Sequence, residues 1–156
     1  VGNSPLDRWD ILGLTGNPCG NDPDKCMICM AWGEARGAGS ECMKAVAQVI
    51  WNRAEKKNKS PCDIVAEPKQ FDAYLHPENK GYEECCTDCV LAGEADKFGA
   101  FKKAAEGWPE EFGGGDPQLD GATLFHSDGF PVSWDKDKVE EVSVPGCSKL
   151  KFYIEL

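Results

Sequence analysis

The chain has 156 residues, 41% of them hydrophobic, and a formal net charge of −10. These values predict one globular domain over residues 1–156, because a chain of this size buries most of its apolar surface in a single core. The charge argues against nucleic acid and anionic membranes as partners, since both attract Lys and Arg. The apolar runs are too short to span a bilayer. We therefore expect a monomer that does not insert into membranes.

The first part of the sequence predicts an irregular segment followed by two helices. Residues 1–22 are rich in Gly, Asn, Pro and Asp and predict an irregular N-terminal wrap. Asp24 is expected to cap a first helix that continues to about Trp32. Ser40 is expected to cap a second helix over 41–56, whose apolar residues follow the helical period.

The remaining elements change from helical to extended along the chain. Residues 62–68 predict a short helical turn, and 87–108 predict a third long helix with an apolar stripe. The segment 107–121 is full of turn residues and predicts a loop. Short runs of β-branched and aromatic residues then predict strands, at 122–127, 130–134, 139–144 and 149–156.

Nine cysteines are many for this length. Disulfides would imply an oxidising environment, whereas Cys26-x-x-Cys29 with Cys86-x-x-Cys89 has the spacing of a zinc site. The pattern favours disulfides, because the zinc set leaves other cysteines unexplained, among them Cys19, Cys42, Cys62 and Cys147. An odd number of cysteines leaves at least one thiol unpaired, and the adjacent Cys85 and Cys86 are not expected to pair with each other.

The usual catalytic nucleophiles are poorly represented. The chain has two histidines, no H-E-x-x-H motif and no phosphate-binding glycine loop. A hydrolase using Cys86 or Cys89 with His126 is one alternative, although nine cysteines make such a pairing easy by chance. We expect His126 to be a structural hydrogen-bonding residue rather than a base.

The stretch WGEARGAG (32–39) places one acid, Glu34, between two predicted helices. A general acid that cleaves a glycosidic bond needs a raised pKa, which apolar surroundings provide. Glu34 follows an apolar helix and lies beside Trp32, so it is a candidate for such an acid. An ordinary surface ion pair with Arg36 or Arg53 is the alternative.

Five segments follow one another along the chain: GEARG (33–37), AVAQVIWNR (45–53), QFDAY (70–74), DGATLFH (120–126) and FY (152–153). In this order they resemble the cell-wall hydrolase family of spore-cortex lytic enzymes and certain phage lysins. The similarity spans about residues 26 to 153, and the first two segments are its most specific part. The resemblance implies a lysozyme-like α+β fold, mainly helical, with a small antiparallel β element near the C-terminus.

The resemblance also implies an activity, that of a peptidoglycan lytic transglycosylase. The family's catalytic glutamate maps onto Glu34, which would protonate the oxygen between N-acetylmuramic acid and N-acetylglucosamine. It would then take a proton from the muramoyl 6-hydroxyl, which closes a 1,6-anhydro ring. No metal and no other cofactor is implied, because the substrate supplies the nucleophile.

The matching segments and the aromatic side chains available to stack on sugars give the expected contacts with peptidoglycan glycan strands. The expected substrate-binding residues are Gln70, Phe71, Tyr74, Gly121, Ala122, Thr123, Phe125, Trp134 and Tyr153. Core packing is the alternative for each aromatic residue. We expect Asn52 and Arg53 to hold the second helix against the loop of Glu34, and Arg36 to point away from it.

The chain departs from the family pattern at three positions. Ala38 stands where relatives often carry a second Glu, Leu150 where they usually carry His, and Asp72 where a small residue is usual. If Asp72 faces Glu34 across one water molecule, a hydrolytic muramidase becomes the alternative. A Cys- or zinc-dependent endopeptidase and a non-catalytic glycan-binding protein are further alternatives. The cysteine content and compact size suit a lysin, phage-encoded or secreted, that acts in the bacterial periplasm and cell wall.

Overall fold

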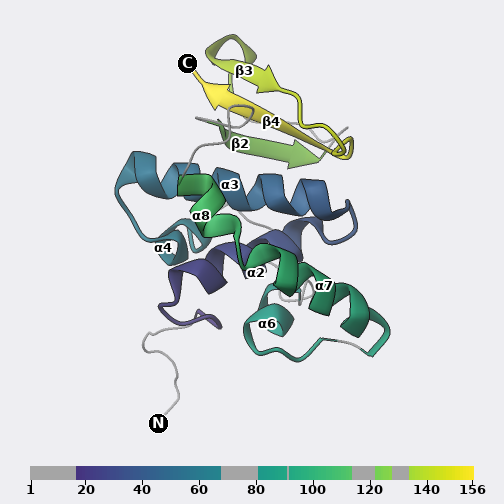
Figure 1. Cartoon of the computed structure of the whole chain (residues 1–156). Coiled ribbons are helices and arrows are strands. Elements are labelled where there is room, and N and C mark those ends of the chain that lie inside the picture. The colour runs from purple at the N-terminus through teal and green to yellow at the C-terminus, as the bar shows by residue number, and fades with distance from the viewer. Residues whose placement is uncertain (1–16, 68–80, 91, 114–121, 128–133) are drawn as a thin grey trace.

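The computed structural model describes residues 17–67, 81–90, 92–113, 122–127 and 134–156. Within them the chain forms six α-helices and a three-stranded antiparallel sheet. This confirms the expected α+β class. In Figure 1 the sheet lies on one side of α3 (Ser40–Lys57), and α2 (Pro23–Ala35) lies on the other side. The fold is therefore layered, with α3 between the sheet and α2.

The first two helices begin one or two residues before the predicted starts. The N-cap of α2 is Asp22, not Asp24, and its carboxylate accepts a hydrogen bond from the backbone N–H of Lys25. Pro23 follows the cap, where its missing N–H has no cost. Ser40 is the first residue of α3 rather than its cap. The cap position belongs to Gly39, whose φ of 102° is accessible to glycine.

The predicted long helix over 87–108 is wrong in its first part. The chain forms α6 (Gly81–Cys86), the short 3₁₀ helix η1 (Ala92–Glu94) and α7 (Ala95–Ala105) instead. Asp88 adopts a left-handed conformation, and the Thr87 hydroxyl donates a hydrogen bond to the Glu83 carbonyl. These features end α6 before α7 begins.

The predicted loop over 107–121 is also partly helical. Its start forms α8 (Trp108–Gly113), with Pro109 and two acidic residues in the first turn. Proline and acidic side chains both favour the first turn of a helix. Earlier in the chain, the short helix α4 (Pro61–Val65) confirms the helical turn that was predicted over 62–68.

The strands are β2 (Ala122–Ser127), β3 (Val139–Val142) and β4 (Leu150–Glu155), preceded at β3 by the 3₁₀ helix η2 (Lys136–Lys138). They confirm three of the four predicted extended segments, and β4 lies in the middle, in the order β2-β4-β3. Phe125 pairs with Phe152 across β2 and β4. Phe152 is fully buried, so this face of the sheet packs toward α3.

Four disulfides confirm the preferred interpretation of the cysteines. They are Cys19–Cys86, Cys26–Cys62, Cys29–Cys85 and Cys42–Cys147. All nine cysteines lie in the described part of the chain, and Cys89, which is exposed, is the free one. The zinc set proposed from the spacing does not form in this oxidised protein, because three of its four members belong to three different disulfides.

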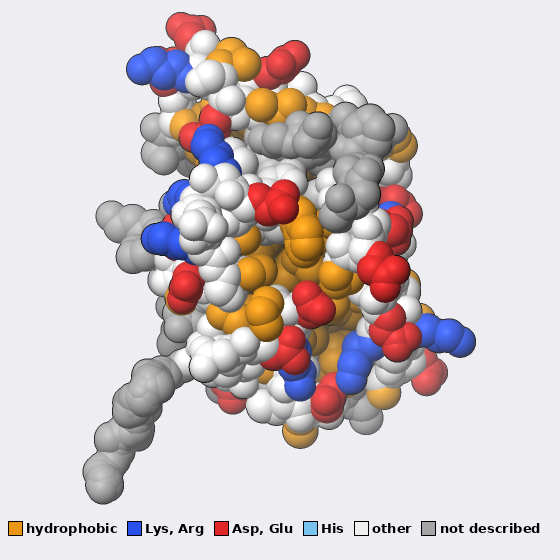
Figure 2. All heavy atoms as spheres, turned by 60° about the vertical axis from the view of Figure 1, so that its left-hand side comes forward, with side chains coloured by type: hydrophobic (Ala, Val, Ile, Leu, Met, Phe, Trp, Pro, Cys, Tyr) orange, Lys and Arg blue, Asp and Glu red, His pale blue; other side chains and the backbone are white. Residues whose placement is uncertain are grey.

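The surface agrees with the negative net charge. On the face shown in Figure 2, acidic side chains predominate around a hollow in which hydrophobic side chains gather. Among the described residues, no helix is long and apolar enough to cross a lipid bilayer.

Candidate functional site

Glu34 lies in the last turn of α2 and is half-buried. Its neighbours Trp32, Gly33 and Ala35 are all buried. Glu34 therefore lies at the edge of the core, between residues that are buried. A general acid needs apolar surroundings that raise its pKa and an open side that admits the substrate.

Trp32, two residues before Glu34, belongs to the core and is not a surface for sugar stacking. Its ring is 1% exposed and packs against Phe98 and Phe101 of α7, at centroid distances of 5.0 and 5.2 Å. The aromatic residue beside the acid thus belongs to the core. It fixes the end of α2 relative to α7.

The backbone that follows Glu34 is held by two lysines from distant parts of the chain. Lys97 of α7 donates a hydrogen bond to the carbonyl of Arg36 at 2.5 Å, and Lys149 donates one to the carbonyl of Gly37 at 3.2 Å. Both cations lie at the C-terminal end of α2, where the helix dipole favours positive charge. The turn is therefore fixed in spite of its glycines.

The Cys42–Cys147 disulfide adds a covalent constraint close to the same turn. Cys42 lies in the first turn of α3, and Cys147 lies in the connection between β3 and β4. The disulfide and the Lys149 hydrogen bond together attach this connection to the junction of α2 and α3. A structural element far along the sequence thus supports the backbone next to Glu34.

Arg36 forms an ion pair with Glu94 of η1, with Nε and Oε1 3.5 Å apart. This agrees with the expectation that Arg36 points away from Glu34. Its guanidinium also lies against Gly81, the first residue of α6, and an added Cβ there would be 2.9 Å from the Cα of Gly33. Helices α2 and α6 therefore approach each other through two glycines directly beside the acid.

A second group of functional candidates, the aromatic group, consists of His126, Trp134 and Tyr153. His126 Nε2 is 2.9 Å from the Tyr153 hydroxyl, and the two rings stack with centroids 5.4 Å apart. Trp134 contacts both rings edge-on, at 5.8 and 5.5 Å. His126 is thus a hydrogen-bonding residue, as expected.

The aromatic group lies on the face of the sheet directed away from α3. The register pairs Phe125 with Phe152 on the inner face, so the alternate residues His126 and Tyr153 belong to the outer face. All three members of the group are half-buried. The indole N–H of Trp134 has no hydrogen-bond acceptor among the described residues. Half-buried aromatic rings on a sheet face can stack on flat ligands.

Ala122 and Thr123, which were expected to contact substrate, are buried where β2 meets α3. The carbonyl of Ala122 accepts a hydrogen bond from Asn52 at 2.9 Å, and that of Thr123 accepts one from Arg53 at 3.1 Å. The Thr123 hydroxyl donates to Glu155 at 2.6 Å. Asn52 and Arg53 are structural, as expected, and these two hydrogen bonds join α3 to β2.

The other predicted substrate contacts divide into two sets. Phe125 is half-buried and stacks on Phe152, with ring centroids 6.0 Å apart. Gln70, Phe71, Tyr74 and Gly121 lie outside the described residues, as does Asp72. Their roles therefore stay predictions.

Sequence reasoning missed the carboxylate that pairs with Arg53. Glu67 accepts hydrogen bonds from Arg53 at 2.6 Å and from Lys57 at 2.7 Å. Burial alone would raise the pKa of Glu67, but the hydrogen bonds and positive charges of these two residues outweigh burial and lower it. A signal was present, because an Arg on the buried face of a helix requires an anionic partner.

The pKa of Glu155 is lowered as well. The hydrogen bond from the Thr123 hydroxyl is the main cause, and Lys56 adds a second hydrogen bond at 3.1 Å. The two carboxyl groups whose pKa is lowered both lie where α3 meets other elements. Their ionised forms thus contribute to the structure that supports the site.

The alternative Cys–His site loses one of its two candidate nucleophiles. Cys86 is bonded to Cys19 and has no thiol. Cys89 follows α6, which packs on α2, whereas His126 lies in β2 on the far side of α3 (Figure 1). The described structure therefore separates the remaining thiol from the histidine.

No family model, no curated protein and no solved structure matches this chain.

Proposed function

We propose that the protein is a peptidoglycan lytic transglycosylase in which Glu34 is the single catalytic acid. The main supporting observation is the position of Glu34, half-buried on the last turn of α2 beside the buried Trp32. The turn that follows is held by Lys97, Lys149 and a disulfide. A catalytic group fixed in this way loses little freedom when substrate binds.

In the proposed reaction Glu34 acts first as an acid and then as a base. Its proton passes to the glycosidic oxygen between N-acetylmuramic acid and N-acetylglucosamine while the bond to the anomeric carbon breaks. The carboxylate then accepts the proton of the muramoyl 6-hydroxyl, whose oxygen bonds to the anomeric carbon. The product is the 1,6-anhydro sugar, and Glu34 is protonated again. No second carboxylate is required.

The aromatic group is the proposed binding surface for additional sugars of the strand. Tyr153 and Trp134 offer half-buried aromatic rings on the side of the sheet directed away from α3. Sugar rings have an apolar face and polar edges, so they match such a surface. Four disulfides suit a protein that acts outside the cytoplasm, at the bacterial cell wall.

Digestion of purified sacculi tests the proposal. The wild type is expected to release muropeptides with anhydro ends, which are lighter by one water molecule than muropeptides with reducing ends. Glu34→Gln is expected to abolish release while the circular dichroism spectrum stays unchanged. Glu55→Gln is the matched control, because Glu55 is an exposed acid on α3, and it should keep full activity.

Each of the other possible results would assign a different activity or a different catalytic residue. Reducing ends alone would mean a muramidase, and release of new amino groups would mean an endopeptidase. Full activity of Glu34→Gln would show that another residue is the acid. Oligosaccharide binding without turnover by the wild type would leave a glycan-binding protein.

A further inference from the structure

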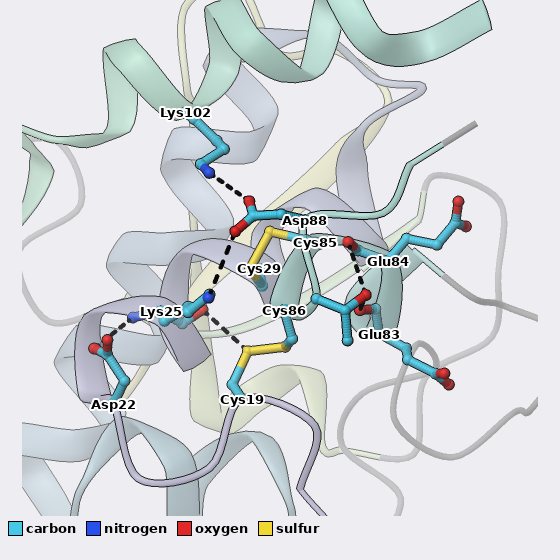
Figure 3. A network of polar contacts seen from close by, with 11 residues as sticks. Cys19, Asp22, Lys25, Cys29, Glu83, Glu84, Cys85, Cys86, Asp88 and Lys102 are labelled. Carbon is cyan, nitrogen blue, oxygen red and sulfur yellow. Dashed lines mark hydrogen bonds and ion pairs between the residues drawn. A yellow bond between two sulfur atoms is a disulfide. The ribbon is translucent and has the colours of Figure 1, made fainter. Parts of the chain in front are cut away.

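Two of the disulfides lie side by side between α2, α6 and the segment before α2. Cys85 and Cys86, adjacent on α6, bond to Cys29 and Cys19 respectively (Figure 3). The sulfur atoms of Cys19, Cys29 and Cys86 all lie within 4.8 Å of one another. The four cysteines therefore form one sulfur cluster, and each of them is less than a tenth exposed.

The sulfur cluster borders a cavity of about 350 Å³. Cys29 and Cys85 form part of its wall. The other lining residues are Asp22, Asp24, Lys25, Ile28, Lys102, Glu106 and Pro109. A reductant of small-molecule size, or a hydrated metal ion, can therefore approach the Cys29–Cys85 disulfide through this cavity.

The charges around the cavity favour the entry of a cation. Asp88 binds both lysines of the lining, Lys25 at 3.9 Å and Lys102 through a short hydrogen bond (Figure 3). The hydrogen bond from Lys102 is the main reason that the pKa of Asp88 is lowered. The positive charges are thus compensated, whereas Asp24 and Glu106 are exposed carboxylates at the same cavity. The surroundings of the cavity are acidic on balance.

Three of the four sulfurs, those of Cys19, Cys29 and Cys86, are close to the separations found in a tetrahedral zinc site. Zn–S bonds of about 2.3 Å separate the sulfurs of a tetrahedral site by about 3.8 Å. The separations of up to 4.8 Å among Cys19, Cys29 and Cys86 need to shrink by about 1 Å. Loss of the S–S bonds would let the bonded pairs move apart to about 3.8 Å, and it would free Cys85, which is bonded to Cys29, to turn toward the other sulfurs.

We propose that reduction converts the sulfur cluster into a zinc site formed by Cys19, Cys29, Cys85 and Cys86. A dithiol or phosphine reductant supplies two electrons to each disulfide. Each S–S bond breaks, and each cysteine takes up one proton. Zn²⁺ then binds the four sulfurs as thiolates and releases four protons. The reduced chain, as it would exist in a thiol-reducing compartment, is held by the metal at the place where the oxidised chain is held by two disulfides.

The proposal is independent of the reaction assigned to Glu34, and metal binding tests it directly. The full chain is reduced with excess phosphine under argon and titrated with Co²⁺. Tetrahedral thiolate coordination gives an intense sulfur-to-cobalt absorption in the near ultraviolet and d–d bands in the visible. One Co²⁺ per chain is expected, displaced by one Zn²⁺. The oxidised protein is expected to give no such spectrum.

Variants identify the ligands. Cys29→Ser is expected to weaken Zn²⁺ binding by at least tenfold and to change the cobalt spectrum. Cys89→Ser and Cys42→Ser should leave both unchanged, because Cys89 is outside the sulfur cluster and Cys42 is bonded to Cys147. Loss of the spectrum in Cys89→Ser would assign the site to the Cys86-x-x-Cys89 spacing and overturn the proposal.

The folding of the reduced chain, with and without Zn²⁺, is a second test of the proposal. A reduced chain that loses its circular dichroism signal and regains it with one equivalent of Zn²⁺ would support the proposal, because structural zinc stabilises the folded state. A reduced chain that stays unfolded with Zn²⁺, or that folds without binding Co²⁺, would overturn it.

Discussion

Replacement of Cys42 and Cys147 by Ser is the most informative test of how the sheet and the helices are held together. This disulfide connects residues 105 positions apart, and it joins the first turn of α3 to the connection before β4. The double variant removes the covalent link and keeps the other three disulfides. Serine is close in size to cysteine, so little packing volume is lost.

The size of the effect follows from the loop that the disulfide closes. For an isolated loop of 105 residues, the chain-entropy relation gives a loss of about 4.8 kcal/mol at 25 °C. The Cys29–Cys85 disulfide already shortens the path between Cys42 and Cys147 in the unfolded chain, to about 75 residues, which lowers the value to about 4.5 kcal/mol. We therefore expect the double variant to lose about 4 kcal/mol of unfolding free energy.

Urea unfolding without reductant, followed by far-ultraviolet circular dichroism, measures this loss. The m value is expected to rise, because the unfolded double variant is less compact. Amide hydrogen exchange near Gly37 is expected to accelerate, since the disulfide supports the turn that follows Glu34. Cys89→Ser is the control for a cysteine-to-serine change, and it should alter stability by less than about 0.5 kcal/mol.

A loss below about 1 kcal/mol would refute this reasoning. It would mean that Cys42 and Cys147 are not bonded in solution, or that the unfolded chain retains the contact between their segments. A mass measurement after thiol alkylation distinguishes these cases, because one free thiol is expected in the wild type and three in any species that lacks this bond.

Three further predictions follow from contacts at other positions. Glu67→Gln should lower the free energy of unfolding by about 2 kcal/mol at neutral pH. Urea unfolding at a series of pH values should show this difference from wild type shrinking below pH 4.5, as the pH falls through the lowered pKa of Glu67. Gly81→Ala should lower the free energy of unfolding by about 2 kcal/mol, because the added Cβ would meet α2. Gly99→Ala, in open space on α7, should raise it by about 0.5 kcal/mol. Thermal unfolding that ranks the two variants the other way would contradict the described packing. Trp134→Ala in the Glu34→Gln background should weaken chito-oligosaccharide binding about tenfold by calorimetry, and unchanged affinity would remove the aromatic group from the binding surface.

The elements that sequence predicts well are those with a strong local signal. The period of α3 and the β-branched and aromatic runs of the strands depend on residues within a few positions of one another. The predicted helix over 87–108 is partly wrong for the opposite reason. Its apolar stripe is helical by period, but the chain turns at Asp88, whose left-handed conformation periodicity does not reveal.

The candidate site follows the same division. Residues beside Glu34 predicted a position between two helices, and the structure has it in the last turn of α2. The groups that fix its turn come from 61 and 112 residues away, because Lys97 and Lys149 bind the carbonyls of Arg36 and Gly37. Hydrogen bonds over such separations depend on the completed fold, and a single sequence carries no local record of them. Glu67 lay near Arg53 in sequence and was still missed, since burial of the Arg was not foreseen.

The order of the cysteines along the chain has a consequence for biosynthesis. Three disulfides use only cysteines between Cys19 and Cys86, and the fourth requires Cys147. During synthesis or export from the N-terminus, the helical half can close covalently before the strands have emerged. Until Cys147 appears, Cys42 and Cys89 are both available as free thiols, and a bond between them would leave Cys147 without its partner. Correct maturation therefore depends on Cys42 staying reduced until the last part of the chain arrives.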